Sequence, residues 1–208
     1  YLLPHPTPLS PELNFVGPDL TRTSYLAACV LAGLGHRRIA LILGTGPLQH
    51  IAEMRHSGYS EALSDKGIAY DPQLVRFLGA LTTHSWQPLI STARAAMSQM
   101  LRIQNPPTAV IVPNSSFAVG LLRALQEAGL RVPEDFSIIV LQEDELGTSL
   151  NPAMTTVDID KAQQQVLLST FLQQYFKGDP LREWRHQLPL TLNRRSSSGP
   201  LRGGGCGR

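Results

Sequence analysis

Short runs of apolar residues alternate along the chain with longer stretches in which apolar residues recur every three or four positions. The clearest runs are residues 39–43, 108–112 and 137–141, which have the length of strands and are apolar on both faces. The longer stretches have the spacing of one helix face, as in residues 23–34. Strands separated by helices of this length require right-handed crossovers. The pattern therefore predicts an α/β fold built on a doubly wound parallel sheet.

The same pattern predicts the remaining elements. Further helices are expected at residues 49–66, 88–102, 115–128 and about 158–178, and weaker strands at 73–78, 155–157 and 187–192. Ser115 or Ser116 is expected to cap one helix and Asp158 another, because their side-chain oxygens accept the free N–H groups of a first turn. The proline-rich start suits neither a helix nor a central strand, and the Ser- and Gly-rich end is typical of disorder.

Two segments join a helix end to a buried strand through a glycine turn. The first is Gly35-His36-Arg37-Arg38, where glycine takes the left-handed conformation that closes a helix and the basic residues complement its negative end. The second, residues 129–139, again ends a helix at glycine, turns on proline and enters an apolar strand. Both segments fit the predicted α/β order.

Composition narrows the class of protein. The 208 residues are enough for one sizeable core or two smaller lobes, and a net charge of +2 gives no footprint for nucleic acid. Cys29 lies in an apolar helix and Cys206 in a glycine-rich tail, so neither a disulfide framework nor a soft-ligand metal site is expected. No apolar run approaches the roughly 20 residues of a membrane span. The chain begins with Tyr1 rather than an initiator Met, so the lack of a signal peptide at its start carries no information.

Candidate ligand contacts follow from the sheet. In open α/β sheets, ligands bind beyond the carboxyl ends of the strands, here residues 44–49, 113–116 and 142–145. Asn114 is the best single candidate, because a carboxamide both donates to and accepts from a hydroxyl group. On the residues alone, Asn114 is equally well explained as a helix cap or turn residue.

Four segments in order, residues 35–42, 106–112, 129–139 and 152–157, resemble the effector-binding domain of the LacI/GalR family of bacterial transcription regulators. The resemblance runs from about residue 14 to 196 and implies a two-lobed fold like that of periplasmic binding proteins. Such regulators carry a helix-turn-helix, a hinge helix and half of an N-terminal lobe before the position of Tyr1, so we expect this chain to be a piece of a longer protein.

The resemblance also divides the chain. Residues 19–156 are expected to form a near-complete C-terminal lobe, and 157–184 a crossover and helix of the N-terminal lobe, whose apolar face would be left exposed. The other parts are a linker or lobe remnant, a return strand to the C-terminal lobe, and a disordered tail, at residues 1–18, 185–196 and 197–208 respectively.

The resemblance assigns a ligand-contacting role to Asn114 and to positions where this chain departs from the family. Counted back from the glycine of the second helix, Glu53 stands where many sugar-binding members have Arg, and Gln142, beside Glu143, stands where they have Asp. These acids favour a ligand that bears an amine; alternatively, Glu53 faces solvent or the site has lost its ligand. We predict ligand contacts at six residues: Gln49, Glu53, Trp86, Asn114, Gln142 and Glu143.

Two more of these six residues, Trp86 and Glu143, also have structural explanations. Trp86 could stack on a sugar at the cleft edge or simply close a helix onto the sheet. Glu143 belongs to an acidic cluster with Asp144 and Glu145, which could hold a hard cation or form a solvated loop.

Catalysis is not expected. Gly44-Thr45-Gly46 lacks the third glycine of a dinucleotide fingerprint, the six histidines are scattered, and no Gly-x-Ser-x-Gly elbow occurs. The resemblance implies a cytoplasmic, homodimeric regulator without cofactor, metal or membrane contact, which senses a sugar or amino-bearing effector and binds operator DNA through a helix-turn-helix absent here. The alternatives are a periplasmic solute (sugar) binding protein and a dimerisation module without a ligand.

Overall fold

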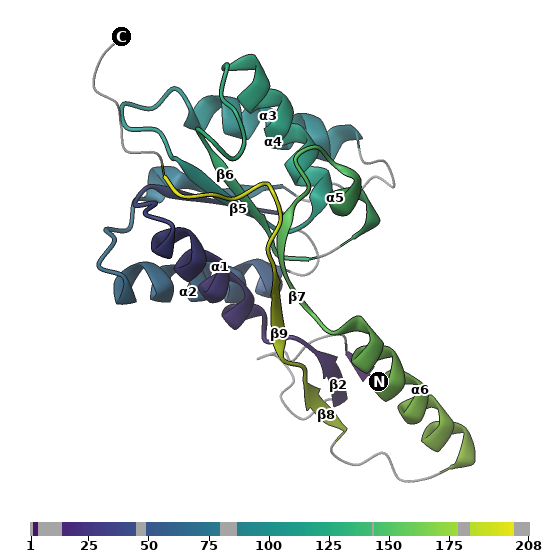
Figure 1. Cartoon of the computed structure of the whole chain (residues 1–208). Helices are drawn as coiled ribbons and strands as arrows, with labels where there is room; N and C mark the ends of the chain where they lie inside the picture. Colours follow the sequence, from purple (N-terminus) through teal and green to yellow (C-terminus); the bar gives the residue numbers. More distant parts are fainter. Residues whose placement is uncertain are drawn as a thin grey trace.

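The computed structural model describes residues 2–3, 14–44, 49–79, 87–142, 144–178 and 184–201, which form a large and a small lobe (Figure 1). The large lobe holds a six-stranded sheet in the order β4-β3-β5-β6-β7-β9. Its strands are β3 (Ile39–Gly44), β4 (Val75–Leu78), β5 (Ala109–Val112), β6 (Ser137–Val140), β7 (Thr155–Ile159) and β9 (Leu190–Asn193). All neighbours are parallel except β9, which is antiparallel to β7. The predicted doubly wound α/β fold is confirmed.

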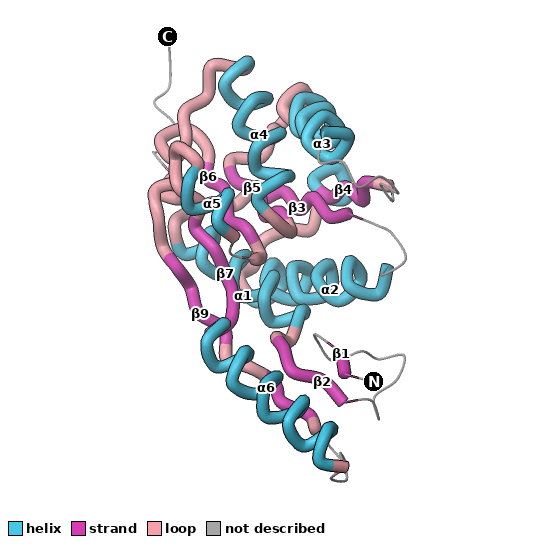
Figure 2. Tube along the Cα trace, turned by 90° about the vertical axis from the view of Figure 1, so that its right-hand side faces the viewer, coloured by secondary structure: helices cyan, strands magenta, loops and turns pink. Residues whose placement is uncertain are grey.

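Helices cover both faces of this sheet (Figure 2). Helices α1 (Leu20–Gly33) and α2 (Gln49–Asp65) lie on one face, and α3 (Gln87–Met100) and α4 (Ser115–Glu127) on the other. Successive residues of a strand point to opposite faces. In β3, accordingly, Leu41 packs with the first helix pair and Ile42 with the second. A short 3-10 turn, η1 (Pro72–Leu74), precedes β4, and a short helix, α5 (Glu145–Ser149), precedes β7. The sequence pattern predicts neither of these two.

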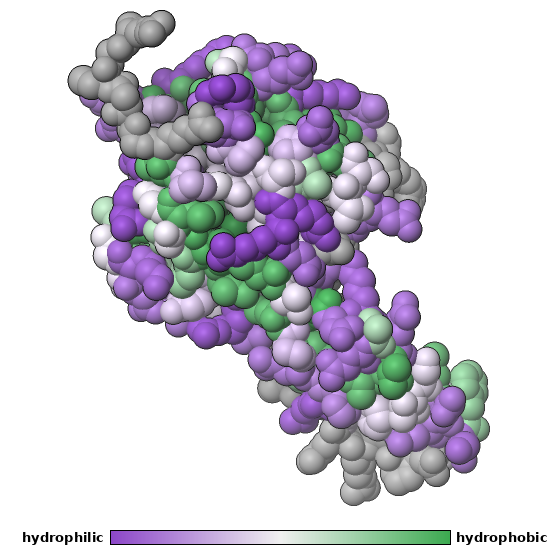
Figure 3. All heavy atoms as spheres, in the orientation of Figure 1, coloured by the Kyte–Doolittle hydropathy of each residue, from purple (hydrophilic) through white to green (hydrophobic). Residues whose placement is uncertain are grey.

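The small lobe is a three-stranded parallel sheet with one helix. Its strand order is β1 (Leu2–Leu3), β2 (Asn14–Gly17) and β8 (Arg185–Gln187), and the helix is α6 (Lys161–Lys177). Phe171 is buried against Trp184, with ring centroids 5.8 Å apart. Other apolar side chains of α6 face solvent, and part of this surface is visible in Figure 3: Val166, Leu172, Tyr175 and Phe176, the last 81% exposed. No described helix is long and apolar enough to cross a membrane.

The chain passes between the lobes at three neighbouring places. These are residues 18–19 between β2 and α1, Asp160 between β7 and α6, and residues 188–189 between β8 and β9. The Leu188 N–H donates to the carbonyl of Gly17 at 2.9 Å, and Ile159 pairs with Leu190. Val16, Ile159 and Leu188 form a small buried cluster at this junction.

Two predicted helix caps are wrong. The cap of α4 is Asn114, not Ser115 or Ser116, and its Oδ1 accepts from the N–H groups of Ser116 (3.1 Å) and Phe117 (3.4 Å). The cap of α6 is Asp160, not Asp158. The reason is that β7 continues to Ile159, so Asp158 is still part of a strand. The helix α6 ends at about residue 178, as predicted, and Gly178 adopts the left-handed conformation there.

The segment that follows β9 is packed rather than disordered as far as Leu201, so the predicted tail is wrong for residues 197–201; residues 202–208 lie outside the described residues. Ser197 is fully buried, and its Oγ donates to the carbonyl of Ile138 (2.7 Å) and accepts from the N–H of Thr155 (2.8 Å). Composition does not predict this order, because serine-rich segments are common in loops. Here the hydroxyl group of Ser197 bonds backbone groups of β6 and β7. The predicted return strand is also split at Leu188 into β8 and β9.

His36 fastens this C-terminal segment to the large lobe. The imidazole is 2% exposed; Nδ1 lies 2.9 Å from Thr108 Oγ1, and Nε2 lies 3.0 Å from Ser137 Oγ and 3.2 Å from the carbonyl of Gly199. Gly35 has the predicted positive φ. Arg37 donates to the carbonyl of Ala32 at 2.9 Å, in the last turn of α1, as the basic turn predicts. Burial lowers the pKa of His36 below its usual 6.5.

Stability is expected to fall on mild acidification because of His36. With the folded-state pKa lowered, the unfolded chain binds more protons as pH drops below about 6.5, so this part of the stability is present above that pH and lost below it. Urea unfolding at about pH 8 and about pH 5.5 measures the loss, which His36→Gln should reduce. Burial also lowers the pKa of His56, so His56→Gln is measured alongside to give the part of the loss that comes from that residue. A His36→Gln profile parallel to that of the parent chain would contradict the assignment.

Candidate ligand-binding site

A pocket of about 350 Å³ lies where the lobes meet, at the carboxyl ends of β6 and β7. It is also bounded by the first turns of α1 and α6 and by one face of α2. The place fits the rule that ligands bind beyond the carboxyl ends of parallel strands, and the size fits a small molecule. Its lining is Pro18, Leu20, Thr23, Ile51, Arg55, Leu141, Gln142, Val157, Asp158, Ile159, Lys161 and Gln164.

Arg55 is the unusual member of this lining. Its Nε is buried without a hydrogen-bond partner, and no ion pair or hydrogen bond engages its guanidinium among the residues that the structure describes. Burial lowers the pKa of Arg55 to about 10. A desolvated cation without a partner is costly to the folded chain. It is therefore the kind of group that a ligand site holds ready for a ligand.

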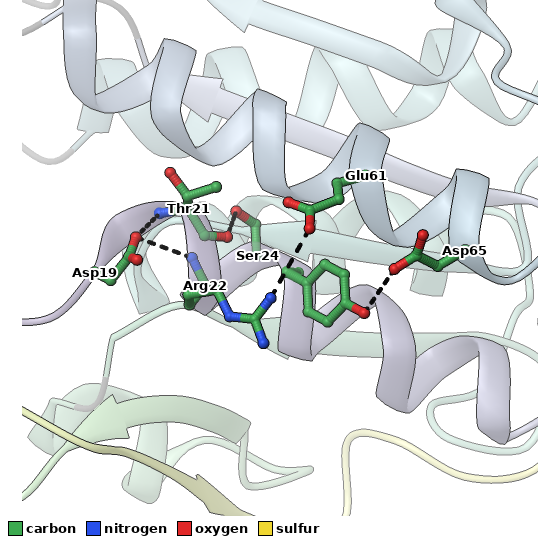
Figure 4. Close-up of polar contacts among 7 residues, drawn as sticks. Asp19, Thr21, Arg22, Ser24, Glu61 and Asp65 are labelled. Atoms are coloured by element: carbon green, nitrogen blue, oxygen red, sulfur yellow. Dashed lines mark hydrogen bonds and ion pairs between the residues drawn. The ribbon is translucent and has the colours of Figure 1, made fainter. Parts of the chain in front are cut away.

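Close packing of α1 on α2 sets the position of Arg55. Ser24 Oγ donates to the carbonyl of Arg55 at 2.6 Å, and one turn later Gly58 lets the backbone of α2 lie directly on the carbonyl of Thr21. Polar contacts on the outer side of the same helix pair hold it together (Figure 4). They are Tyr25 OH to Asp65 Oδ2 at 2.8 Å and Arg22 to Glu61 at 3.9 Å. Asp19 caps α1 itself, since its Oδ1 accepts from the N–H groups of Thr21 and Arg22.

Asp158 is the one carboxylate among the described lining residues. It is 8% exposed; Oδ1 accepts from the N–H of Ile159 (2.8 Å), and Oδ2 lies 3.3 Å from Lys161 Nζ. Gln164 is anchored at the junction by donating from Nε2 to the carbonyl of Val16 at 3.2 Å. Its carboxamide oxygen and the exposed Gln142 add neutral polar groups to the pocket.

The structure treats the six predicted contact residues differently. Gln142 lines the pocket. Glu53 does not: it is exposed, and its Oε1 accepts from Gln49 Nε2 at 2.9 Å, so both residues belong to the outer surface of α2. Asn114 uses its Oδ1 as the cap of α4, and its role in ligand binding stays a prediction. Trp86 and Glu143 lie outside the described residues.

Arg55 is the residue that sequence reasoning missed. Positions two apart on an α-helix point about 200° away from each other, so Arg55 faces inward where Glu53 faces outward. A signal was present, since Arg55 stands four residues after the half-buried Ile51 and three before the buried Gly58. Counting from the glycine gave the wrong helix phase, which made the charge at the site look inverted.

A second pocket, of about 430 Å³, lies at the end of α4. Its lining residues are Leu122, Leu125, Gln126, Gly129, Leu130, Arg131, Val132, Asn151 and Pro152. Its charged side chain, Arg131, is already paired with Asp135 at 2.8 Å.

The part of the chain that is described holds no group of three His, Cys, Asp or Glu side chains able to bind a metal ion. The pocket between the lobes is therefore the better candidate.

Comparison with known proteins places most of the chain in one family. Residues 29–198 match the family described as periplasmic binding protein-like domain. Among curated relatives, the ribose operon repressor of Haemophilus influenzae is 34% identical over 72% of this chain and 42% of its own length. The transcriptional repressor CytR of Escherichia coli is 34% identical over 70% of this chain and 40% of its own length. The chain thus spans about two fifths of these relatives.

A solved structure gives the same result. A LacI family transcriptional regulator from Enterococcus faecium, crystallised with bound ribose, is 28% identical and has a TM-score of 0.73. The match covers 91% of this chain and 66% of that protein. The comparison of sequences and the comparison of folds therefore point to the same family.

Proposed function

Since the chain belongs to the periplasmic binding protein-like domain family, as the effector-binding domain of a LacI/GalR-type regulator, we propose that the pocket between its lobes binds a small polar effector. Binding changes the angle between the lobes. In the longer protein, this angle sets the spacing of paired DNA-binding segments in a homodimer and so the affinity for operator DNA. A coupling of about 1 to 3 kcal/mol is enough for such control.

The observation that carries the proposal is Arg55 in the pocket, whose guanidinium has no hydrogen-bond or ion-pair partner among the described residues. A guanidinium donates in a planar fork, which suits the oxygens of a sugar or a related metabolite. Asp158 and Gln164 supply acceptors beside it, and Gln142 lies at the rim. The names of the relatives point the same way, since one is a ribose operon repressor and a solved neighbour holds ribose.

An amine-bearing effector has less support than a sugar. That idea came from Glu53 together with Gln142 and Glu143. Glu53 lies outside the pocket, paired with Gln49, and Glu143 lies outside the described residues. The charge that faces the pocket from α2 is the positive one of Arg55.

Calorimetric titration of the chain with ribose and a panel of other pentoses and hexoses tests the proposal. At least one sugar is expected to bind, and Asp158→Asn is expected to weaken it about tenfold, because a neutral carboxamide accepts hydrogen bonds more weakly than a carboxylate. Asp65→Asn, on the outer surface of α2, is the matched control and should leave binding unchanged. The proposal is wrong if no sugar binds, or if both variants bind like the parent chain.

A further inference from the structure

Ser24 is a buried polar residue of α1 that does not belong to the described lining of the pocket. A serine inside a helix commonly bonds a carbonyl of its own preceding turn. Here the hydroxyl oxygen lies 3.4 Å from the carbonyl of Leu20 and 3.5 Å from that of Thr21, but only 2.6 Å from the carbonyl of Arg55 in α2. The main hydrogen bond of Ser24 therefore joins the two helices.

Two neighbouring contacts hold α2 against α1 at the level of Arg55. The Arg55 carbonyl lies within α2, where it accepts from the helix ladder, so the Ser24 hydroxyl is an additional donor. Three residues later, Gly58 lets the α2 backbone lie directly on the carbonyl of Thr21. The Nε of Arg55 itself has no hydrogen-bond partner among the described residues. The place of the guanidinium in the pocket therefore depends on how its backbone is held.

We propose that Ser24 is a positioning residue of the effector site, which holds the Arg55 backbone so that the guanidinium reaches the pocket. The inference rests on the proposed function, because it adds to the same site a residue that lies outside the lining. The long arginine side chain turns a small rotation of α2 into a larger displacement of the guanidinium. Without the Ser24 hydroxyl, α2 is free to rotate, and the guanidinium is less well placed before the effector enters.

Tyr25, the next residue of α1, provides a matched control. Its OH donates to Asp65 Oδ2 at 2.8 Å, so it also joins α1 to α2, but at the last residue of α2 and on the outer side of the pair (Figure 4). Tyr25→Phe and Ser24→Ala each remove one hydrogen bond between the same two helices. General loosening of the pair is common to both variants, whereas only Ser24→Ala releases the backbone of Arg55.

The Nε–H group of Arg55 gives a readout that needs no ligand. Its nitrogen is buried, so hydrogen exchange with water requires a local opening, whose rate nuclear magnetic resonance of the isotope-labelled chain measures. Arg55→Lys identifies the signal by removing it. Relative to the backbone amides of α1 and α2, we expect Ser24→Ala to speed this exchange about tenfold and Tyr25→Phe less than about twofold. Ser24→Cys should resemble Ser24→Ala, because it keeps the side-chain volume but a thiol is a weak donor.

Calorimetric titration of the same variants with ribose, or with another sugar of the panel that binds, extends the test to affinity. Ser24→Ala should weaken binding about three- to tenfold, the effect of one hydrogen bond, and Tyr25→Phe should bind like the parent chain. Equal Arg55 exchange in these two variants, parent-like exchange in Ser24→Cys, or unchanged affinity in Ser24→Ala overturns the inference and leaves the proposed function standing. If no sugar binds, the proposed function fails, and the exchange rates still decide the role of Ser24.

Discussion

Replacing Gly58 by alanine is expected to destabilise the chain by about 3 kcal/mol or more, one of its two largest single-site effects. A Cβ atom at this position would overlap the carbonyl oxygen and carbon of Thr21. These are backbone atoms of α1, which no rotamer change moves, so α1 and α2 would have to separate. Separation would also break the bond from Ser24 Oγ to the carbonyl of Arg55. Urea or thermal unfolding of the two chains measures the difference.

A second glycine in the same helix pair provides the control. Gly33, at the end of α1, has no atom within 4 Å of the place where a Cβ would lie. Gly33→Ala is therefore expected to be neutral or to stabilise by about 0.5 kcal/mol, through the lower entropy of the unfolded chain. Equal unfolding midpoints for the two variants would show that close approach of the helices is unimportant.

Replacing Arg55 by methionine is expected to stabilise the ligand-free chain by about 2 kcal/mol while removing its response to the effector. Burial lowers the pKa of Arg55 from 12.5 to about 10, which corresponds to roughly 3 kcal/mol for carrying the charge. Because the folded-state pKa is lowered, this penalty is fully present below about pH 10, and therefore at neutral pH. Methionine keeps the length and the apolar contacts without the charge.

Thermal unfolding with and without the ligand separates the two effects. The variant should melt at a higher temperature alone and show no further rise with ligand, whereas the parent chain should rise with ligand. Arg22→Met is the matched control, because Arg22 is half-exposed on α1 and should change stability by less than about 0.5 kcal/mol. A lower melting temperature for Arg55→Met would mean that Arg55 stabilises the folded chain.

The elements of the large lobe were predictable from local pattern. Strands such as β3 and β5 are apolar on both faces and bounded by glycine or proline, and their helices carry one apolar face. The predictions that were wrong concern features that depend on contacts between residues far apart in the sequence. The cap of α6 moved from Asp158 to Asp160 because pairing with β9 extends β7. The end of the chain is ordered because Ser197 satisfies the ends of β6 and β7, which composition alone does not indicate.

The place of the site was predictable, but its chemistry was not. Ligands bind beyond the carboxyl ends of parallel strands, and this rule predicted Gln142, which lines the pocket. It could not give the rotation of α2 about its axis, and an error of two residues replaced Arg55 by Glu53. That error reversed the sign of the charge expected on the face of α2 that lines the pocket. Packing against α1 decides which face of α2 points to the pocket. The order of charged residues along the sequence does not give that information.

The three connections between the lobes limit the motion that a ligand is able to bias. A body attached at one point swings in any direction, but three neighbouring attachments that are bonded to one another leave it essentially one rotation, about the line through them. That line passes through the junction of Gly17, Ile159 and Leu188. A ligand in the proposed site would act near this axis, where a small displacement at the pocket would become a larger one at the far end of α6. We therefore expect lobe motion to be described by a single angle at this junction.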